Sequence, residues 1–328
     1  MTSERVEWVD LLKGIAIVLV VYGHAARGMQ ASGAISFNSF WGSIDYIVYS
    51  IHMPIFFAAS GFLYRGSGRP GYWQKKVVTI MWPYFLWTTI HVLLQAYMSG
   101  SGAVNREVSV WRLATIAWDP VSPFWFLYSL FFVFVISALL DSLSIISTLL
   151  VALTLMAIFN SFGPEGSPVT DIPYGLLYFT LGRYYATVKE AVTIPRSQLL
   201  LAVSVFLIID FVGIKVQLPV RLNIIATLFG LWSMMRFAKF ATQSVASVPV
   251  IILGRCSMGI YVMHIIVIAF ARAIGNKLHL PPIAILGSCV PLAVLLPVVA
   301  QAAINWLSFG QVLGLKTDLT IPLPNAGN

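Results

Sequence analysis

The sequence predicts an all-helical, polytopic integral membrane protein with about ten transmembrane helices and no soluble domain. The first reason is composition, because 59% of the 328 residues are hydrophobic and only 10% are charged. A soluble domain carries about 25% charged residues, so this chain lacks the polar surface that water requires. The second reason is a mean hydropathy of +0.86. The third is that the apolar residues fall into long segments separated by short loops.

A transmembrane helix needs about 20 mostly apolar residues to cross about 30 Å of hydrocarbon. The hydropathy pattern gives ten such segments, of which the fourth and fifth are separated only by Asp141 and Ser142. No internal repeat or linker divides the chain, so residues 1–328 are predicted to form one transmembrane domain. The predicted spans are 9–27, 41–64, 77–98, 122–140, 143–160, 172–188, 198–214, 220–240, 248–272 and 281–307.

The basic residues predict the orientation of the chain. Lys and Arg concentrate in the cytoplasmic loops of membrane proteins, and Arg65, Arg69, Lys75 and Lys76 crowd the loop between the second and third spans. The loops after the sixth and eighth spans, around 183–196 and 236–239, are also basic. This distribution places both termini in the cytoplasm. We attribute the net charge of +8 to topology and to contacts with anionic lipids or an anionic cosubstrate, not with nucleic acid.

The first predicted span carries three polar side chains that are costly in lipid: Asp10, Lys13 and His24. Lys13 and His24 are eleven residues apart, which places them on one helix face, about 16 Å apart along the axis. Asp10 lies three residues before Lys13 and can pair with it on that face. One interpretation is an interfacial ion pair with a packed histidine. The other is catalytic, because an imidazole is well suited to act as a general base.

Three more histidines lie inside predicted spans: His52, His91 and His264. With the predicted topology, all four histidines fall in the middle or outer part of the membrane, where several could line one cavity. We expect no metal site, because no carboxylate or thiol accompanies them at ligand spacing. His91 is the histidine most easily explained by packing. After His52, Pro54 and the Ser60-Gly61 pair favour either close helix contact or a local break in the second span.

The loop that contains Arg65, Lys75 and Lys76 is the densest basic patch of the sequence. Positive-inside anchoring explains such a patch, and so does binding to the phosphates of a cytoplasmic nucleotide-containing donor. Trp125, at the outer start of the fourth span, fits an aromatic belt.

Five segments of the chain, taken in order, resemble the acyltransferase family 3 membrane proteins. The first helix of that family carries a basic residue, ten intervening residues and a histidine, as Lys13 and His24 do here. The closing block of the family ends in Tyr-x-x-His, which resembles Tyr261 and His264. The family's basic position is often arginine, and some members carry an extracytoplasmic esterase-like domain that this chain lacks. The matching segments are residues 7–24, 52–62, 75–84, 125–127 and 253–264.

The resemblance implies transfer of an acyl group, most often acetyl, from cytoplasmic acyl-CoA to a carbohydrate hydroxyl in a surface or exported glycan. It implies no tightly bound cofactor, with acyl-CoA as cosubstrate. Lys13, oriented by Asp10, is expected to position the pantetheine or thioester end. His24 is expected to accept the hydroxyl proton or to carry the acyl group. The expected phosphate ligands are Arg65, Lys75 and Lys76, and the expected site lining is His52, Ser60, Trp125, Tyr261 and His264.

The rival hypothesis is a secondary transporter or flippase for a glycan or glycolipid, because intramembrane histidines and an Asp-Lys pair also occur in proton-coupled carriers. That hypothesis predicts internal repeats with paired broken helices, and the sequence has no convincing repeat. The acyltransferase prediction implies a bacterial inner membrane, with both termini inside and a partner from a polysaccharide synthesis or export system.

Overall fold

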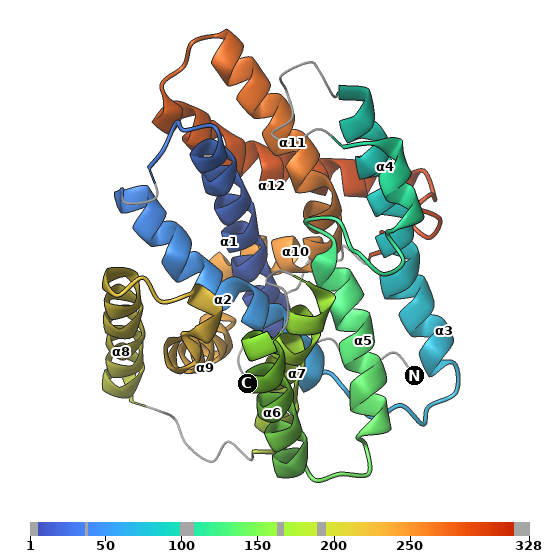
Figure 1. Ribbon diagram of the computed structural model, residues 1–328, viewed down its shortest axis with the longest axis vertical. Coiled ribbons are helices and arrows are strands. Elements are labelled where there is room, and N and C mark those ends of the chain that lie inside the picture. The colour runs from blue at the N-terminus through green and yellow to red at the C-terminus, as the bar shows by residue number, and fades with distance from the viewer. Residues whose placement is uncertain (1–5, 37–38, 99–107, 163–166, 189–194, 318–328) are drawn as a thin grey trace. The chain divides into compact units, whose positions relative to one another are not determined.

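The computed structural model describes residues 6–36, 39–98, 108–162, 167–188 and 195–317, and these residues form helices without a β-strand. The all-helical prediction is therefore confirmed for this part of the chain (Figure 1). Part of the predicted basic loop, residues 189–194, lies outside it. The helices are α1 Glu7–Ala31, α2 Phe40–Phe62, α3 Tyr72–Lys76, α4 Trp82–Met98, α5 Trp125–Leu139, α6 Ile145–Phe162, α7 Pro168–Thr187, α8 Arg196–Lys215, α9 Ile224–Ala241, α10 Val248–Arg255, α11 Ser257–Lys277 and α12 Pro282–Trp306.

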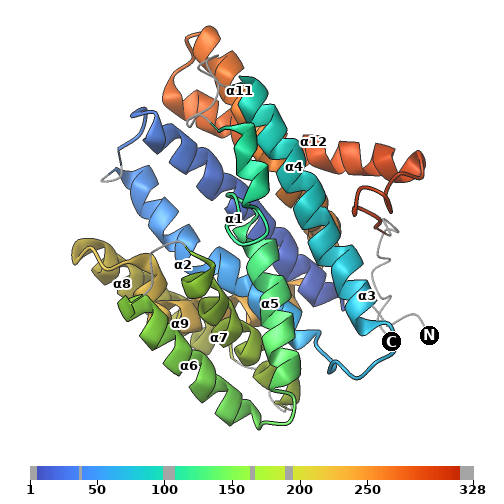
Figure 2. The same cartoon turned by 45° about the vertical axis from the view of Figure 1, so that its right-hand side comes forward.

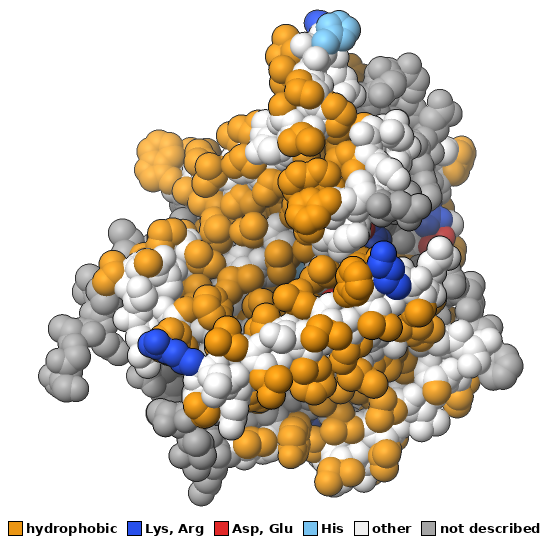
Figure 3. Space-filling view, turned by 90° about the vertical axis from the view of Figure 1, so that its left-hand side faces the viewer, with side chains coloured by type: hydrophobic (Ala, Val, Ile, Leu, Met, Phe, Trp, Pro, Cys, Tyr) orange, Lys and Arg blue, Asp and Glu red, His pale blue; other side chains and the backbone are white. Residues whose placement is uncertain are grey.

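Six helical segments are long and apolar enough to cross a bilayer, which supports an integral membrane protein. Three further apolar helices are shorter, so the predicted count of about ten spans is not established. Figure 3 shows a face on which hydrophobic side chains predominate and Lys and Arg are sparse, as lipid contact requires. The six segments are Glu7–Ala31, Tyr72–Met98, Arg196–Lys215, Ile224–Ala241, Ser257–Lys277 and Pro282–Trp306.

The described helices divide between two compact units. The first unit takes in α1, α2 as far as Ile55, and α8 to α12. The second takes in the end of α2, α3 to α7, and the short segment Phe309–Leu315. Each unit has buried apolar side chains of its own, such as Leu12 and Ile17 in the first and Phe179 in the second.

In the first unit, α1 packs against α9, α10, α11 and α12. Its closest approach is to α10, where Gly14 meets the carbonyl of Val250 and Gly254 meets the carbonyl of Asp10. A Cβ atom at either glycine would overlap the opposing backbone, so only glycine permits this separation. These pairs also give the direction, because Val250 lies beside Gly14 and Gly254 beside Asp10. The helix α10 therefore runs antiparallel to α1.

The predicted ninth span, residues 248–272, is wrong as a single helix. It is divided at Cys256 into α10 and α11, which Figure 1 shows as separate helices. After the break α11 runs parallel to α1, with His264 beside His24 and Arg272 Nη1 bonded to the carbonyl of Gly28 at 2.9 Å. Gly254, Arg255 and Ser257 interrupt the apolar pattern around Cys256, and the reversal is accompanied by the close contact of α10 with α1.

In the second unit, the end of α2 packs against α7 through small residues. A Cβ atom at Gly61 would overlap the carbonyl of Phe179, and one at Gly182 would overlap the carbonyl of Ala58. Of the two roles expected for Ser60 and Gly61, close helix contact is therefore the observed one. The helix α2 continues without a break through Pro54.

The third predicted span is one rod made of α3, a π-helical turn at Val77–Met81, and α4 (Figure 2). Pro83 lacks a backbone N–H, which favours such a turn just before it. The segment Phe309–Leu315 is hydrogen-bonded to α4. Trp82 Nε1 donates to the carbonyl of Val312 at 2.7 Å, and Trp87 Nε1 donates to that of Leu313 at 3.0 Å.

Candidate active site

An ion-pair cluster lies near the start of α1. Lys13 Nζ is 2.8 Å from Asp10 Oδ1, which confirms the pairing expected from their spacing. Arg255, at the end of α10, places its Nε 3.5 Å from Asp10 Oδ2 and its Nη2 4.0 Å from Glu7 Oε1. Thr317 Oγ1 donates to the carbonyl of Arg255 at 3.0 Å. The Asp10 carboxylate is thus buried between two cations, while a quarter of the Lys13 side chain remains exposed.

A histidine pair lies further along α1. The rings of His24 and His264 have centroids 5.1 Å apart. His264 is fully buried and His52 nearly so, whereas His24 is half-buried. In the described part of the chain, no residue hydrogen-bonds to the His24 ring. His52 is close enough to His24 for an electrostatic interaction. These three histidines therefore lie close to one another in the first unit.

Backbone carbonyls orient two of these rings. His264 Nδ1 lies 2.7 Å from the carbonyl of Tyr261, and His52 Nδ1 lies 2.7 Å from that of Val48. A carbonyl only accepts a hydrogen bond, so each Nδ1 carries the proton when the ring is neutral. The basic nitrogen of both rings is then Nε2. Tyr261 supplies the carbonyl that orients His264, and its own ring lies 6.1 Å from the His264 ring between centroids.

Charged and aromatic side chains adjoin the histidines towards the end of α1. Arg27 Nε is 3.1 Å from Asp45 Oδ2, and its guanidinium lies 3.0 Å from the centroid of the Tyr49 ring. Tyr49 in turn packs edge-on against His52, with centroids 4.6 Å apart. A Cβ atom at Gly23 would approach this tyrosine ring to 2.8 Å, so Gly23 makes room for it. The Tyr49 ring therefore lies between the positively charged Arg27 and His52.

The remaining predicted lining residues belong to the second unit. Ser60 and Trp125 are both half-buried, Ser60 near the end of α2 and Trp125 at the start of α5. His91 is buried in α4 and packs edge-on against Phe124, with centroids 4.8 Å apart, as expected for a packed histidine.

The three predicted phosphate ligands differ in their surroundings. Lys75 and Arg65 are exposed, whereas Lys76 is half-buried with its Nζ 3.3 Å from the centroid of the Phe134 ring. Lys76 is therefore engaged in a cation–π contact within the second unit.

No role in the site was predicted for Arg255 or Arg183, which the structure brings into charged clusters. Both are buried or nearly so, and each pairs with an aspartate far away in the chain. The only signal for Arg255 was its position in the motif that ends in Tyr261 and His264. In the described residues, no group of three His, Cys, Asp or Glu side chains is arranged to hold a metal ion.

These features define a helical integral membrane protein with paired histidines and an ion-pair cluster on its first helix. The model of the acyltransferase family 3 domain matches residues 6–302. The chain therefore belongs to this family of acyltransferases.

Two curated relatives share the name Nodulation protein NolL. The one from Mesorhizobium japonicum is 25% identical over 192 residues, which are 56% of this chain and 49% of the relative. The one from Sinorhizobium fredii is 27% identical over 209 residues, which are 60% and 53% of the two chains. The match thus spans about half the length of these relatives. No solved structure matches the chain significantly.

Proposed function

We propose that the protein is a membrane O-acyltransferase that moves an acyl group, most often acetyl, from cytoplasmic acyl-CoA to a carbohydrate hydroxyl. The observation that carries the proposal is His24, a half-buried imidazole on an apolar helix with no hydrogen-bond partner among the described residues and a buried histidine against its ring. Intramembrane polar groups are costly, so one without a structural partner points to function. Membership of an acyltransferase family supports the same reaction.

In the proposed reaction, His24 accepts the proton of the acceptor hydroxyl as its oxygen attacks the thioester carbonyl. The new C–O ester bond forms, the C–S bond breaks, and the CoA thiolate leaves and recovers the proton. In a relay variant, the His24 nitrogen carries the acyl group first and then passes it to the hydroxyl. General base catalysis accelerates such a reaction roughly 10²–10⁴-fold. Because the thioester is already activated, this acceleration together with positioning of the two substrates accounts for the proposed catalysis.

Lys13 and Asp10 act further along the donor. Lys13 and His24 lie about 16 Å apart along α1, so a small substrate cannot contact both residues. Acyl-CoA is long enough, because its pantetheine arm separates the thioester from the nucleotide. The ammonium of Lys13 has three donors and gives one to Asp10, which leaves two for amide carbonyls of the arm. His52, His264 and Tyr261 hold the base in place within the first unit.

The proposed cell location is a bacterial inner membrane with both termini in the cytoplasm. Acyl-CoA then binds from the cytoplasm, where the basic loops lie. The reaction requires no tightly bound cofactor. The acceptor is a glycan on its way to the cell surface, supplied by a partner from polysaccharide synthesis or export.

The test is release of CoA from acetyl-CoA by the purified protein in detergent, with and without a mixed pool of glycans. We expect His24→Ala to abolish release while eluting as a monodisperse species. The matched control is His279→Asn, because His279 is exposed, lies outside the site, and has a φ of 53° that Asn tolerates. Equal activity of His24→Ala and His279→Asn would refute the assignment of the base. A wild type that moves glycan across liposomes and turns over no acyl-CoA would instead establish the transporter hypothesis.

A further inference from the structure

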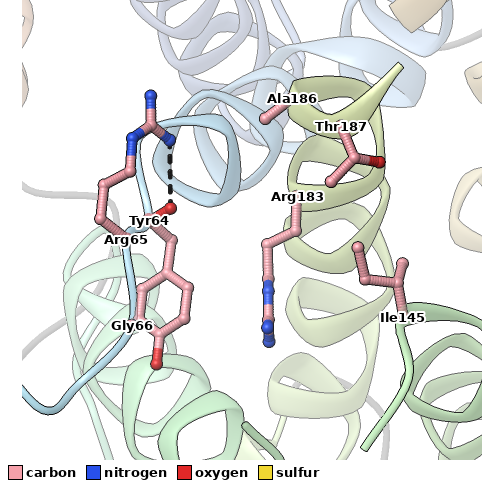
Figure 4. Close-up of a pocket in the computed structure, with 7 residues that line it drawn as sticks. All are labelled: Tyr64, Arg65, Gly66, Ile145, Arg183, Ala186 and Thr187. Atoms are coloured by element: carbon pink, nitrogen blue, oxygen red, sulfur yellow. Dashed lines mark hydrogen bonds between the residues drawn. The ribbon is translucent and has the colours of Figure 1, made fainter. Parts of the chain in front are cut away.

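A pocket of about 490 Å³ opens in the second unit, beside the turn that follows α2. Figure 4 shows the guanidinium groups of Arg65 and Arg183 pointing in opposite directions, with the Tyr64 ring beside Arg183. Gly66 has a φ of 83°, a left-handed turn that suits glycine and carries the chain past the pocket. The pocket is lined by Tyr64, Arg65, Gly66, Ile145, Arg183, Ala186 and Thr187.

Arg183 is held in place from one side only. Its Nη2 lies 3.3 Å from Asp141 Oδ1, and its guanidinium stacks 4.9 Å from the centroid of the Tyr64 ring. Its Nη1 is buried and has no hydrogen-bond partner among the described residues. A buried donor of a charged group is costly to leave unpaired, so the position calls for an anionic ligand.

Asp141 cannot turn away to neutralise the pocket, because other donors hold its second oxygen. The Tyr64 hydroxyl donates to Asp141 Oδ2 at 2.6 Å, and the Ser67 hydroxyl and backbone N–H donate to it at 3.0 and 3.2 Å. Burial, followed by the hydrogen bond to Asp141, raises the pKa of Tyr64, so its hydroxyl remains a donor. Asp141 thus interacts with Arg183, Tyr64 and Ser67. Its single negative charge cannot neutralise both arginines, so the pocket keeps a net positive charge.

Arg65 supplies the second cation. Its Nη1 donates to the carbonyls of Phe62 at 2.6 Å and Tyr64 at 3.1 Å, which fixes the side chain at the rim. Its Nε and Nη2 have no hydrogen-bond partner in the part of the chain that the structure describes. Two arginines with unused donors at separate places suit a ligand with two separate anionic groups, because guanidinium binds phosphate with a preformed fork.

We infer that this pocket binds the phosphorylated nucleotide end of acyl-CoA, with Arg183 and Arg65 on different phosphate groups. The inference rests on the proposed function and names the donor site, with Arg183 in place of Lys75 and Lys76, neither of which lines the pocket. The same phosphate chemistry is offered by an anionic lipid headgroup, so the experiment separates the two sources.

The experiment measures binding of adenosine 3′,5′-bisphosphate to the purified full-length protein in neutral detergent, with adenosine as the probe without phosphates. We expect Arg183→Gln and Arg65→Gln each to weaken binding of the bisphosphate by roughly tenfold or more, as expected for a charged hydrogen bond. Binding of adenosine should change little. The matched control is Arg69→Gln, since Arg69 is exposed in the same loop and does not line the pocket. Equal affinity of the Arg183, Arg65 and Arg69 variants would overturn the inference.

Arg183→Lys covers the case in which Arg183→Gln does not fold. It keeps a charge beside Asp141 but not the fork, so we expect intermediate affinity, and wild-type affinity would overturn the inference. The contribution of lipid is tested by measuring binding of the bisphosphate in nanodiscs with and without phosphatidylglycerol. We expect the bisphosphate to bind in both. Binding of the nucleotide that phosphatidylglycerol abolishes would assign the pocket to lipid and overturn the inference. Because the readout is binding, Arg183-dependent affinity without acyl transfer would refute the proposed function alone.

Discussion

The contact between Gly14 and Gly254 makes the sharpest prediction about how the site is held. In Gly254→Ala, the added Cβ would lie far closer to the Asp10 carbonyl oxygen than van der Waals contact allows, and 2.9 Å from the Gly14 nitrogen. Both are backbone atoms of α1, so no side-chain rotation relieves the overlap and the two helices must separate. Overpacking of this kind costs about 1–3 kcal/mol, and a backbone clash belongs at the upper end, so we expect about 3 kcal/mol of destabilisation.

Separation of the helices should also affect the ion-pair cluster, because Arg255 follows Gly254 directly and reaches Asp10 at 3.5 Å. The assay is thermal denaturation in detergent followed by size-exclusion chromatography, together with CoA release. The control is Gly287→Ala in α12, where an added Cβ meets no atom within 4 Å. That change should be neutral or stabilise the helix by about 0.5–1 kcal/mol. If Gly254→Ala denatures at the same temperature as Gly287→Ala and keeps full activity, the close approach of α1 and α10 is refuted.

Three further predictions concern single polar groups. Lys13→Arg should keep most of the CoA release and Lys13→Ala should raise the KM for acyl-CoA by roughly tenfold, and complete loss in Lys13→Arg would contradict an anchoring role. His264→Ala should lower kcat by roughly tenfold at unchanged KM, because it removes the ring that packs against the proposed base, and an unchanged kcat would contradict this. Asp210→Ala should destabilise the protein by about 2–4 kcal/mol in thermal denaturation, because Ser50 and Asn223 both donate to this buried carboxylate at 2.8 Å, whereas Asp210→Asn should cost less.

Local hydropathy predicts the helices of this chain well and their interruptions poorly. The turn between α5 and α6 was predicted from only two polar residues, Asp141 and Ser142, and the structure confirms two helices there. The break at Cys256 was not predicted, although Gly254, Arg255 and Ser257 interrupt the apolar pattern there as Asp141 and Ser142 do between α5 and α6. It follows from the glycine contact of α10 with α1 and from the pairing of Arg255 with Asp10, and neither is visible in a window of neighbouring residues.

The same distinction applies to the site. The pairing of Asp10 with Lys13 was predicted because it depends only on helical spacing, and it is observed at 2.8 Å. The contact of His24 with His264 depends on the direction of α11 after the break, so composition could suggest it but not locate it. The phosphate ligands were sought in the loop with the highest density of Lys and Arg. Arg183 was counted only as a topology signal in the basic region around 183–196, because its place beside Asp141 and Tyr64 depends on tertiary contacts.

Hydrogen bonding distinguishes Asp210 and Asp141 from His24 and Arg183. Buried polar groups in lipid or protein interiors need partners, and Asp210 and Asp141 have them in Ser50, Asn223, Tyr64 and Ser67. The ring of His24 and Nη1 of Arg183 have no hydrogen-bond partner among the described residues. In the proposed reaction, His24 accepts the proton of the hydroxyl and Arg183 binds a phosphate of the donor. Their substitution should therefore impair catalysis and donor binding respectively, and removal of Asp210 should impair only folding.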